Sequence, residues 1–184
     1  IRAMAASQEG LVYRWPRVVF LDVDGVLNHP AHWERQRLRE DIGQPSKPLR
    51  QCDSACVERV LRLCYETGAK LVVSSTHRHP YLSETRRTFE RYGFPPALIV
   101  SATPLLDVPS RPDDPTSTLR RGATRGQEIR AWLLSNPNAQ RRFAILDDGT
   151  DMGELMPYLV LVDSAVGLTD GDCALAVELL EDRN

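Results

Sequence analysis

A short apolar run that ends in two aspartates is the strongest constraint in this sequence. The four apolar residues 18–21 predict a strand that is buried on both faces of a sheet. Gly25 ends the run, so Asp22 and Asp24 stand at the C-terminal end of this strand, where alternation directs both side chains to one side. Two crowded carboxylates repel each other, and a bound cation or a shared proton relieves that repulsion. Taken alone, the stretch also fits a strand that enters an Asp-Gly hairpin turn.

Chain length and charge limit the organisation that this strand can belong to. At 184 residues, the chain fits a single domain over 1–184. Within it we expect a lead-in at 1–16, a small flap at 29–51 and an exposed, proline-rich loop at 103–124. The net charge of -2 argues against a surface built for non-specific nucleic-acid binding.

The cysteines and the apolar runs indicate the cellular environment. The sequence has 4 cysteines without a CxxC pair or metal-ligand spacing, so we expect free thiols in a reducing compartment. No apolar run approaches the length of a membrane span, and no signal-peptide core is present. We therefore predict a cytoplasmic protein with no membrane association and no obligate protein partner.

Strand-like and helix-like segments alternate along the chain. Strands are predicted at 17–22, 70–75, 97–101, 142–146 and 159–162. Helices are predicted at 33–40, 53–66, 82–92, 127–134 and 170–181. Asp53 is expected to cap the second of these helices, and Thr169 with Asp172 the last. This order predicts an α/β fold with a mostly parallel sheet of about five strands and helices on both faces.

Polar side chains follow several of the predicted strands. In parallel sheets, ligands bind beyond the carboxyl ends of the strands. The residues at these ends are Asp22, Asp24, Ser74, Ser75, Asp147, Asp148 and Asp163. Core packing does not explain acids and hydroxyls delivered by separate strands to one edge, so we expect a functional site there.

Four motifs in this order resemble the haloacid dehalogenase (HAD) superfamily of phosphohydrolases over about residues 17–181. The motifs are Asp22-Val23-Asp24-Gly25, Ser75 or Ser74, Arg125 at the start of a helix, and Asp147-Asp148 with Asp151. Four segments look similar to the small HAD domain associated with Swiss Army Knife RNA repair proteins. They are residues 71–78, 125–133, 145–152 and 167–169. The resemblance implies a HAD-like Rossmannoid fold with a small cap or none.

The resemblance also implies the roles of the acids. Asp22 would be the nucleophile that forms an aspartyl-phosphate, and Asp24 the general acid and base. Mg²⁺ would be held by Asp22, by the backbone carbonyl of Asp24 and by Asp147. Asp148 would coordinate the metal directly, bind it through a water molecule or hydrogen-bond to another metal ligand. Asp151 is a further candidate metal ligand.

Groups that bind the phosphoryl oxygens follow from the same resemblance. Only 2 of the 23 basic residues, Lys47 and Lys70, are lysines, and neither is expected at the site. Arg125 is therefore the expected cation, with Arg121 and Arg78 as alternatives. Ser75 is preferred to Ser74 as the hydroxyl. Candidate substrate-binding residues are Ser74, Thr76, Arg78 and Gly25.

The histidines offer a different kind of site. His77 and His79, together with His29 and His32, raise the alternative of a zinc site. Because no cysteine stands at ligand spacing and both pairs are predicted in loops, we interpret these histidines as exposed or substrate-facing.

Three functions remain open from the sequence. The preferred one is a Mg²⁺-dependent phosphomonoesterase with a phosphorylated small molecule or nucleic-acid end as substrate. The first alternative is a nucleic-acid-end phosphatase of RNA or DNA repair. The second is a HAD-like binding module whose site has decayed. Asp22, Asp24 and Asp147 are all present, which favours an enzyme.

Overall fold

A five-stranded parallel sheet forms the centre of the fold. The computed structural model describes residues 17–41, 52–109, 120–140 and 142–181. The strand order is β3-β2-β1-β6-β7, and every pairing is parallel. The strands are β1 (Val18–Leu21), β2 (Lys70–Val73), β3 (Ile99–Ala102), β6 (Phe143–Asp147) and β7 (Leu159–Leu161). The predicted α/β fold with a parallel sheet is confirmed.

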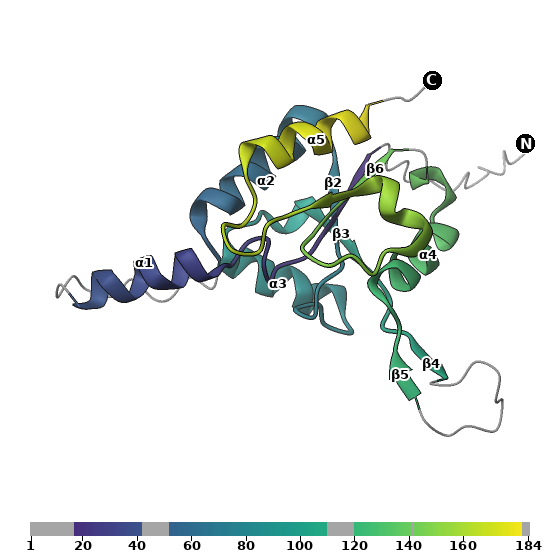
Figure 1. Cartoon of the computed structure of the whole chain (residues 1–184). Helices are drawn as coiled ribbons and strands as arrows, with labels where there is room; N and C mark the ends of the chain where they lie inside the picture. The colour runs from purple at the N-terminus through teal and green to yellow at the C-terminus, as the bar shows by residue number, and fades with distance from the viewer. Residues whose placement is uncertain (1–16, 42–51, 110–119, 141, 182–184) are drawn as a thin grey trace, which may run out of the picture.

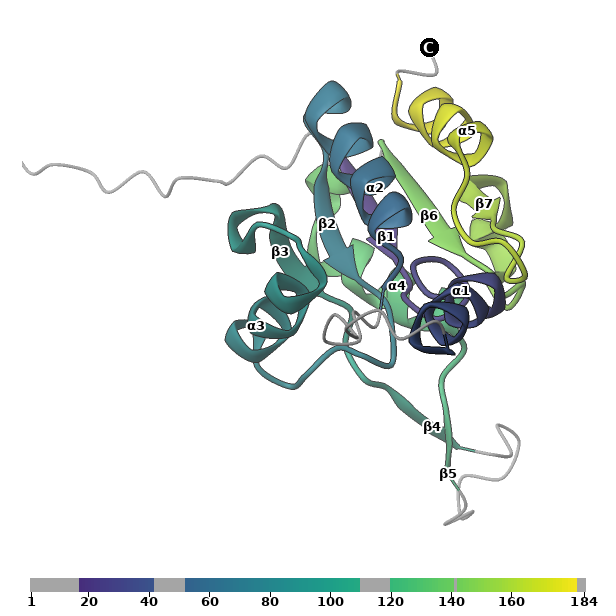
Figure 2. The same cartoon turned by 90° about the vertical axis from the view of Figure 1, so that its left-hand side faces the viewer.

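Helices cover both faces of this sheet (Figures 1 and 2). One face packs against α2 (Ser54–Thr67), α3 (Leu82–Tyr92) and α5 (Asp170–Leu180). The other face packs against α4 (Arg125–Ser135). Short 3₁₀ turns occupy Pro96–Leu98, Pro137–Ala139 and Gly153–Tyr158. Among the helices of the described residues, none is long and apolar enough to cross a membrane.

The central strand β1 explains why the sheet needs two helical layers. All four of its side chains are fully buried, as the apolar run predicts. Val19 and Leu21 belong to the core beneath α2 and α5, whereas Phe20 meets Trp132 of α4 edge-on, with ring centroids 5.3 Å apart. Each such burial contributes about 1.5–3 kcal/mol. The acids that follow β1 are therefore held at the end of the most buried strand.

Capping residues set the helix ends near the site. The predicted caps are confirmed, because the Asp53 side chain accepts a hydrogen bond from the Ala55 N–H, and Thr169 forms a capping box with Asp172. A further capping box joins Thr124 to Gln127 and fixes the first turn of α4. This turn carries Arg125.

Two segments differ from the sequence prediction. Helix α1 (Pro30–Asp41) begins before the predicted 33–40, because proline is well suited to the first helical turn. Residues 103–124, expected as a loop, contain an antiparallel hairpin of β4 (Asp107–Pro109) and β5 (Arg120–Gly122) that projects from the sheet (Figure 2). The predicted lead-in at 1–16, residues 42–51 of the predicted flap and residues 110–119 between the two hairpin strands lie outside the described residues.

Candidate active site

The carboxyl ends of three neighbouring strands meet at one edge of the sheet. Leu21 of β1 is in register with Val73 of β2 and with Leu146 of β6. The next residue of each strand segment, Asp22, Ser74 and Asp147, therefore stands at the same level. Backbone hydrogen bonds extend the pairing, since the Asp22 N–H donates to the Leu146 carbonyl at 3.0 Å.

Three carboxylates converge at this edge. Oxygens of Asp22, Asp147 and Asp148 lie within 4.8 Å of one another. Asp22 and Asp147 are buried, whereas Asp148 is exposed. Asp147 Oδ1 accepts a hydrogen bond from the Gly149 N–H at 2.9 Å, while its buried Oδ2 has no hydrogen-bond partner in the described structure. An acidic oxygen buried in this way is suited to binding a cation.

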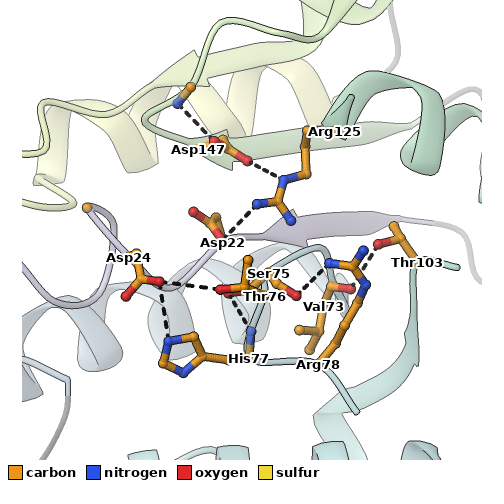
Figure 3. A network of polar contacts seen from close by, with 12 residues as sticks. Asp22, Asp24, Val73, Ser75, Thr76, His77, Arg78, Thr103, Arg125 and Asp147 are labelled. Carbon is orange, nitrogen blue, oxygen red and sulfur yellow. Dashed lines mark hydrogen bonds and ion pairs between the residues drawn. The ribbon is translucent and has the colours of Figure 1, made fainter. Parts of the chain in front are cut away.

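Arg125 lies across two of these carboxylates (Figure 3). Its Nη2 is 3.5 Å from Asp22 Oδ1, and its Nε forms an ion pair at 3.3 Å with Asp147 Oδ2, without hydrogen-bond geometry. The position of Arg125 at the start of α4 places its guanidinium beside the expected nucleophile. Residue Arg121 lies in β5, and its side chain is outside the described part of the structure.

Burial makes the acidic cluster electrostatically costly. Burial raises the pKa of Asp22, although Arg125 opposes the shift. Burial, and then the neighbouring Asp22 carboxylate, raise the pKa of Asp147 to about 7. A divalent cation among these oxygens would stabilise their charged forms. The donors are hard carboxylate oxygens, so the residues present fit Mg²⁺.

Asp24 is held by a separate set of contacts. Asn28 Nδ2 donates to Asp24 Oδ1 at 2.8 Å, and His77 Nε2 lies 3.3 Å from Asp24 Oδ2. The other ring nitrogen of His77 is 2.6 Å from the Tyr92 hydroxyl. Figure 3 shows Asp22 between Arg125 and Asp24. Sequence reasoning did not identify His77 as a partner of Asp24, because only the fold brings the β2 loop to the β1 turn.

The two serines after β2 have different surroundings. The Ser75 hydroxyl lowers the pKa of Asp22 against the larger, opposite effect of burial, and it accepts a hydrogen bond from the His77 N–H at 3.2 Å. The Ser74 hydroxyl is fully buried without a partner in the described structure. Thr76 is exposed, and its hydroxyl is 3.5 Å from Asp24 Oδ2. Ser75 is therefore the serine that acts on Asp22 in this structure, and its role as the phosphate-binding hydroxyl stays a prediction.

Arg78 points into the protein. Its Nη2 is 2.6 Å from Glu128 Oε2, and its Nη1 donates to the Ser75 carbonyl at 2.6 Å. Both members of the ion pair are buried, so Arg78 fastens the β2 loop to α4. Arg78 also lines a hollow of about 380 Å³ together with Thr103 and Leu105. Its contact with substrate stays a prediction, and Glu128 is a partner that the sequence did not indicate.

A known family accounts for most of the chain. A family model described as "HAD domain in Swiss Army Knife RNA repair proteins" matches residues 18–173. The chain belongs to this family. Comparisons with curated proteins and with solved structures gave no match. The resemblance seen in the sequence is thereby confirmed, and this HAD domain is a HAD-type phosphohydrolase in general terms.

Glycine in the first motif of this HAD domain makes room for an acid of the fourth. Gly25 has a φ of +77°, and a Cβ there would lie 2.3 Å from Asp148 Oδ2. Any side chain at Gly25 would therefore displace Asp148 from the cluster. This packing gives Gly25 a steric role, and its contact with substrate stays a prediction.

Asp151 holds the helix that carries Arg125. Asp151 Oδ2 accepts a hydrogen bond from the Arg125 N–H at 2.9 Å, and the Asp151 carbonyl accepts one from the Gly126 N–H at 3.2 Å. Asp151 thus stabilises the α4 N-terminus, where a negative charge is favourable. Asp163, in contrast, accepts from the Ala165 N–H in a turn after β7.

Gly126→Ala is expected to weaken the site by moving α4. A Cβ at Gly126 would lie 2.3 Å from the Met152 carbonyl oxygen, so the helix start must shift away from the loop after β6. We expect a loss of about 1–3 kcal/mol of stability and a decrease in activity, because Arg125 is the neighbouring residue. Thermal unfolding and phosphatase assays measure the two effects. Gly122→Ala is the control, since a Cβ at Gly122 would meet no atom within 4 Å. Equal effects of both substitutions would contradict this explanation.

Proposed function

We propose that this HAD domain is a Mg²⁺-dependent phosphomonoesterase that works through an aspartyl-phosphate on Asp22. The convergence of Asp22, Asp147 and Asp148 beside the guanidinium of Arg125 carries the proposal. Structural need alone does not account for these buried acids, because burial disfavours their charged forms. Asp22, Asp147 and Asp148 would hold Mg²⁺, which supplies positive charge that lowers the repulsion between a phosphate and the nucleophile.

In the first step, a carboxylate oxygen of Asp22 attacks phosphorus and the bond from phosphorus to the leaving oxygen breaks. Asp24 donates its proton to that leaving oxygen. Arg125 and the Ser75 hydroxyl lie beside Asp22, where they can bind phosphoryl oxygens as charge moves onto them. The product of this step is the alcohol together with phosphorylated Asp22.

In the second step, Asp24 takes a proton from water while the water oxygen attacks phosphorus. The bond between phosphorus and the Asp22 oxygen then breaks, which releases phosphate and restores the carboxylate. Asp24 suits both steps because its side chain is 60% exposed and held by Asn28 and His77. It can therefore reach both the leaving group and incoming water.

A nucleic-acid end is the second candidate substrate. The description of the matching family names RNA repair proteins. Around the site, the described residues contain the helix α1 and the β4–β5 hairpin as additions to the sheet and its covering helices. These additions form no separate cap domain within that part of the chain.

Hydrolysis of p-nitrophenyl phosphate with Mg²⁺ or with EDTA tests the reaction class. We expect turnover that stops in EDTA and returns when Mg²⁺ is added in excess. A panel of nucleotides, sugar phosphates and 3′- or 5′-phosphorylated oligonucleotides then distinguishes the two substrate classes. If no substrate is hydrolysed and beryllium fluoride with Mg²⁺ does not bind, the proposal fails and a binding module replaces it.

His77→Ala is expected to reduce activity in a way that depends on the leaving group. If His77 orients Asp24 as the acid, its loss should lower kcat/KM, which reports the first step, by about 10-fold for an alkyl phosphate, whose leaving oxygen needs protonation. The effect should be much smaller for p-nitrophenyl phosphate, whose leaving group needs little protonation. His77→Gln is the matched variant, since its amide retains a donor and should recover part of the rate. An equal loss on both substrates would contradict the orienting role.

A further inference from the structure

The structure points to a second metal site, away from the catalytic acids. We propose that His29, His32, Asp53 and Cys56 form a buried site for Zn²⁺ between the start of α1 and the start of α2. This site is independent of the proposed phosphatase reaction. It also corrects the interpretation of His29 and His32 as exposed, because only 3% of His29 and 5% of His32 is accessible.

Three potential ligand atoms converge at this position, and a fourth, from His32, lies near one of them. His29 Nε2 is 3.1 Å and His32 Nδ1 is 3.9 Å from the same oxygen, Asp53 Oδ2. The ligand atoms of His29, Asp53 and Cys56 all lie within 4.8 Å of one another. Ligands of a tetrahedral zinc ion lie about 3.3–3.8 Å apart, given zinc–ligand distances of about 2.0–2.3 Å. The separations of His29 Nε2 and His32 Nδ1 from Asp53 Oδ2 lie close to that range.

The type and burial of the donors favour zinc over magnesium. Two imidazoles, one thiol and one carboxylate provide nitrogen, sulfur and oxygen ligands, which is a donor set that Zn²⁺ accepts and Mg²⁺ does not. The site is also closed, as structural zinc sites are. Gly167 lies over it, so a Cβ at this position would come 2.5 Å from His29 Cδ2 and 3.1 Å from Cys56 Sγ.

The existing partners of these groups can be exchanged for a metal. Arg35 forms an ion pair with Asp53 Oδ2, but its side chain is 55% exposed and can turn toward solvent. The Cys56 thiol lies 3.6 Å from the Leu168 carbonyl. On binding, Cys56 would lose its proton to solvent and coordinate Zn²⁺ as a thiolate.

Helix α1 supplies a physical reason for such a site. It projects from the body of the protein (Figure 1), and among its described side chains, residues 30–38, only His32 is buried. Trp33 and Leu38 are exposed. A helix with so little apolar packing has a weak attachment to the core. A metal bound at its first turn would fasten it to α2.

Cobalt substitution tests the site directly. The purified chain is stripped of metal and titrated with Co²⁺ in the presence of excess Mg²⁺, and absorption is recorded. We expect one equivalent to produce a thiolate-to-cobalt charge-transfer band, which one equivalent of Zn²⁺ then removes. Cys56→Ser should abolish the band. Cys64→Ser is the matched control, because this buried cysteine lies elsewhere in α2 and should leave the band unchanged.

Two further variants keep the test decisive if Cys56→Ser fails to fold. His32→Ala should retain the band but weaken Co²⁺ affinity by at least 10-fold, and Asp147→Asn should leave both unchanged. Zinc should also raise the melting temperature of the wild type more than that of His32→Ala. The proposal is overturned by the absence of a charge-transfer band in the wild type. It is equally overturned if the band survives in folded Cys56→Ser or disappears in Asp147→Asn.

Discussion

Asp22→Asn is expected to lower kcat on p-nitrophenyl phosphate by at least about 10³-fold. An amide oxygen is a poor nucleophile, so the covalent step is lost even though the side chain keeps its shape. The fold should persist, because burial already favours the neutral form of Asp22 by raising its pKa. Steady-state kinetics and thermal unfolding measure the two properties. Asp163→Asn is the matched control, since Asp163 lies in the turn after β7, outside the acidic cluster, and should keep full activity.

Trapping of the phosphoenzyme shows whether Asp22 is the nucleophile or only stabilises charge in the site. Asp24→Asn should slow hydrolysis of the intermediate, because no carboxylate remains to take a proton from water. Rapid quenching of this variant with an aryl phosphate should therefore yield a peptide that carries one phosphoryl group on Asp22. The double variant with Asp22→Asn should carry none. Phosphorylation of any other residue would refute the assignment of Asp22.

Local signals explain why much of the fold follows from the sequence. The helix from Leu82 to Tyr92 has the bounds that the sequence predicts, because Gly93 adopts the left-handed conformation that ends a helix. The buried strand at 18–21 is predicted equally well, because a short apolar run rich in valine favours a strand buried on both faces. The start of the third strand is predicted less accurately, because the 3₁₀ turn at Pro96–Leu98 has a similar apolar composition.

Contacts between distant segments limit the prediction of the site. Parallel strands end at one edge of the sheet, and the fold places Arg125 beside the acids at this edge. Because the parallel strands can be predicted from the sequence, this shared edge can be predicted too. Nothing in the local pattern pairs Arg78 with Glu128, so the sequence suggests substrate binding for Arg78 and does not reveal its buried ion pair. The β4–β5 hairpin escapes prediction for a related reason. Its strands have three residues each and pair with each other in a sheet of two strands.

Cys56, the proposed zinc ligand, illustrates the same limit. Spacing along the chain separates it from His29, and the sequence therefore argues against zinc. In the fold, the turn after β1 brings the two segments together, as the Asp53 N–H donates to the Leu27 carbonyl at 2.7 Å. Ligand spacing in a sequence identifies a zinc site when the ligands are recurrent cysteine and histidine pairs, as in zinc fingers. A site that adds a carboxylate and a single cysteine from a distant segment becomes visible only in the fold.

Asp147→Asn is expected to remove Mg²⁺-dependent activity while it stabilises the metal-free protein. Activity should fall by about 10²–10⁴-fold, because the buried Oδ2 is replaced by a group that binds a cation weakly. Stability should rise by about 1–3 kcal/mol at pH 8, because the wild type must hold a buried charge that the amide lacks. Thermal unfolding in EDTA should show this as roughly 2–4 °C for each kcal/mol.

The pH dependence gives the sign of this effect. Burial and the Asp22 carboxylate raise the pKa of Asp147 from 3.8 in the unfolded chain to about 7 in the folded one. Between these values the unfolded state releases the proton and the folded state keeps it, so wild-type stability in EDTA should fall as pH rises from about 4 to 7. Asp147→Asn should show a smaller decline, to which Asp22 with its raised pKa still contributes, whereas Asp163→Asn should retain the wild-type decline.

Added Mg²⁺ should offset the loss of stability caused by the buried charge of Asp147, and it should do so only in the wild type. At pH 8 the ion would bind the charged form of Asp147, so added Mg²⁺ should raise the wild-type melting temperature and leave that of Asp147→Asn almost unchanged. The two curves should approach each other as Mg²⁺ increases. If Asp147→Asn is instead less stable than the wild type in EDTA at pH 8, the ion pair with Arg125 outweighs the burial of the charge. The acidic cluster would then stabilise the fold without a metal, and the stability measurement would no longer support a metal-binding role.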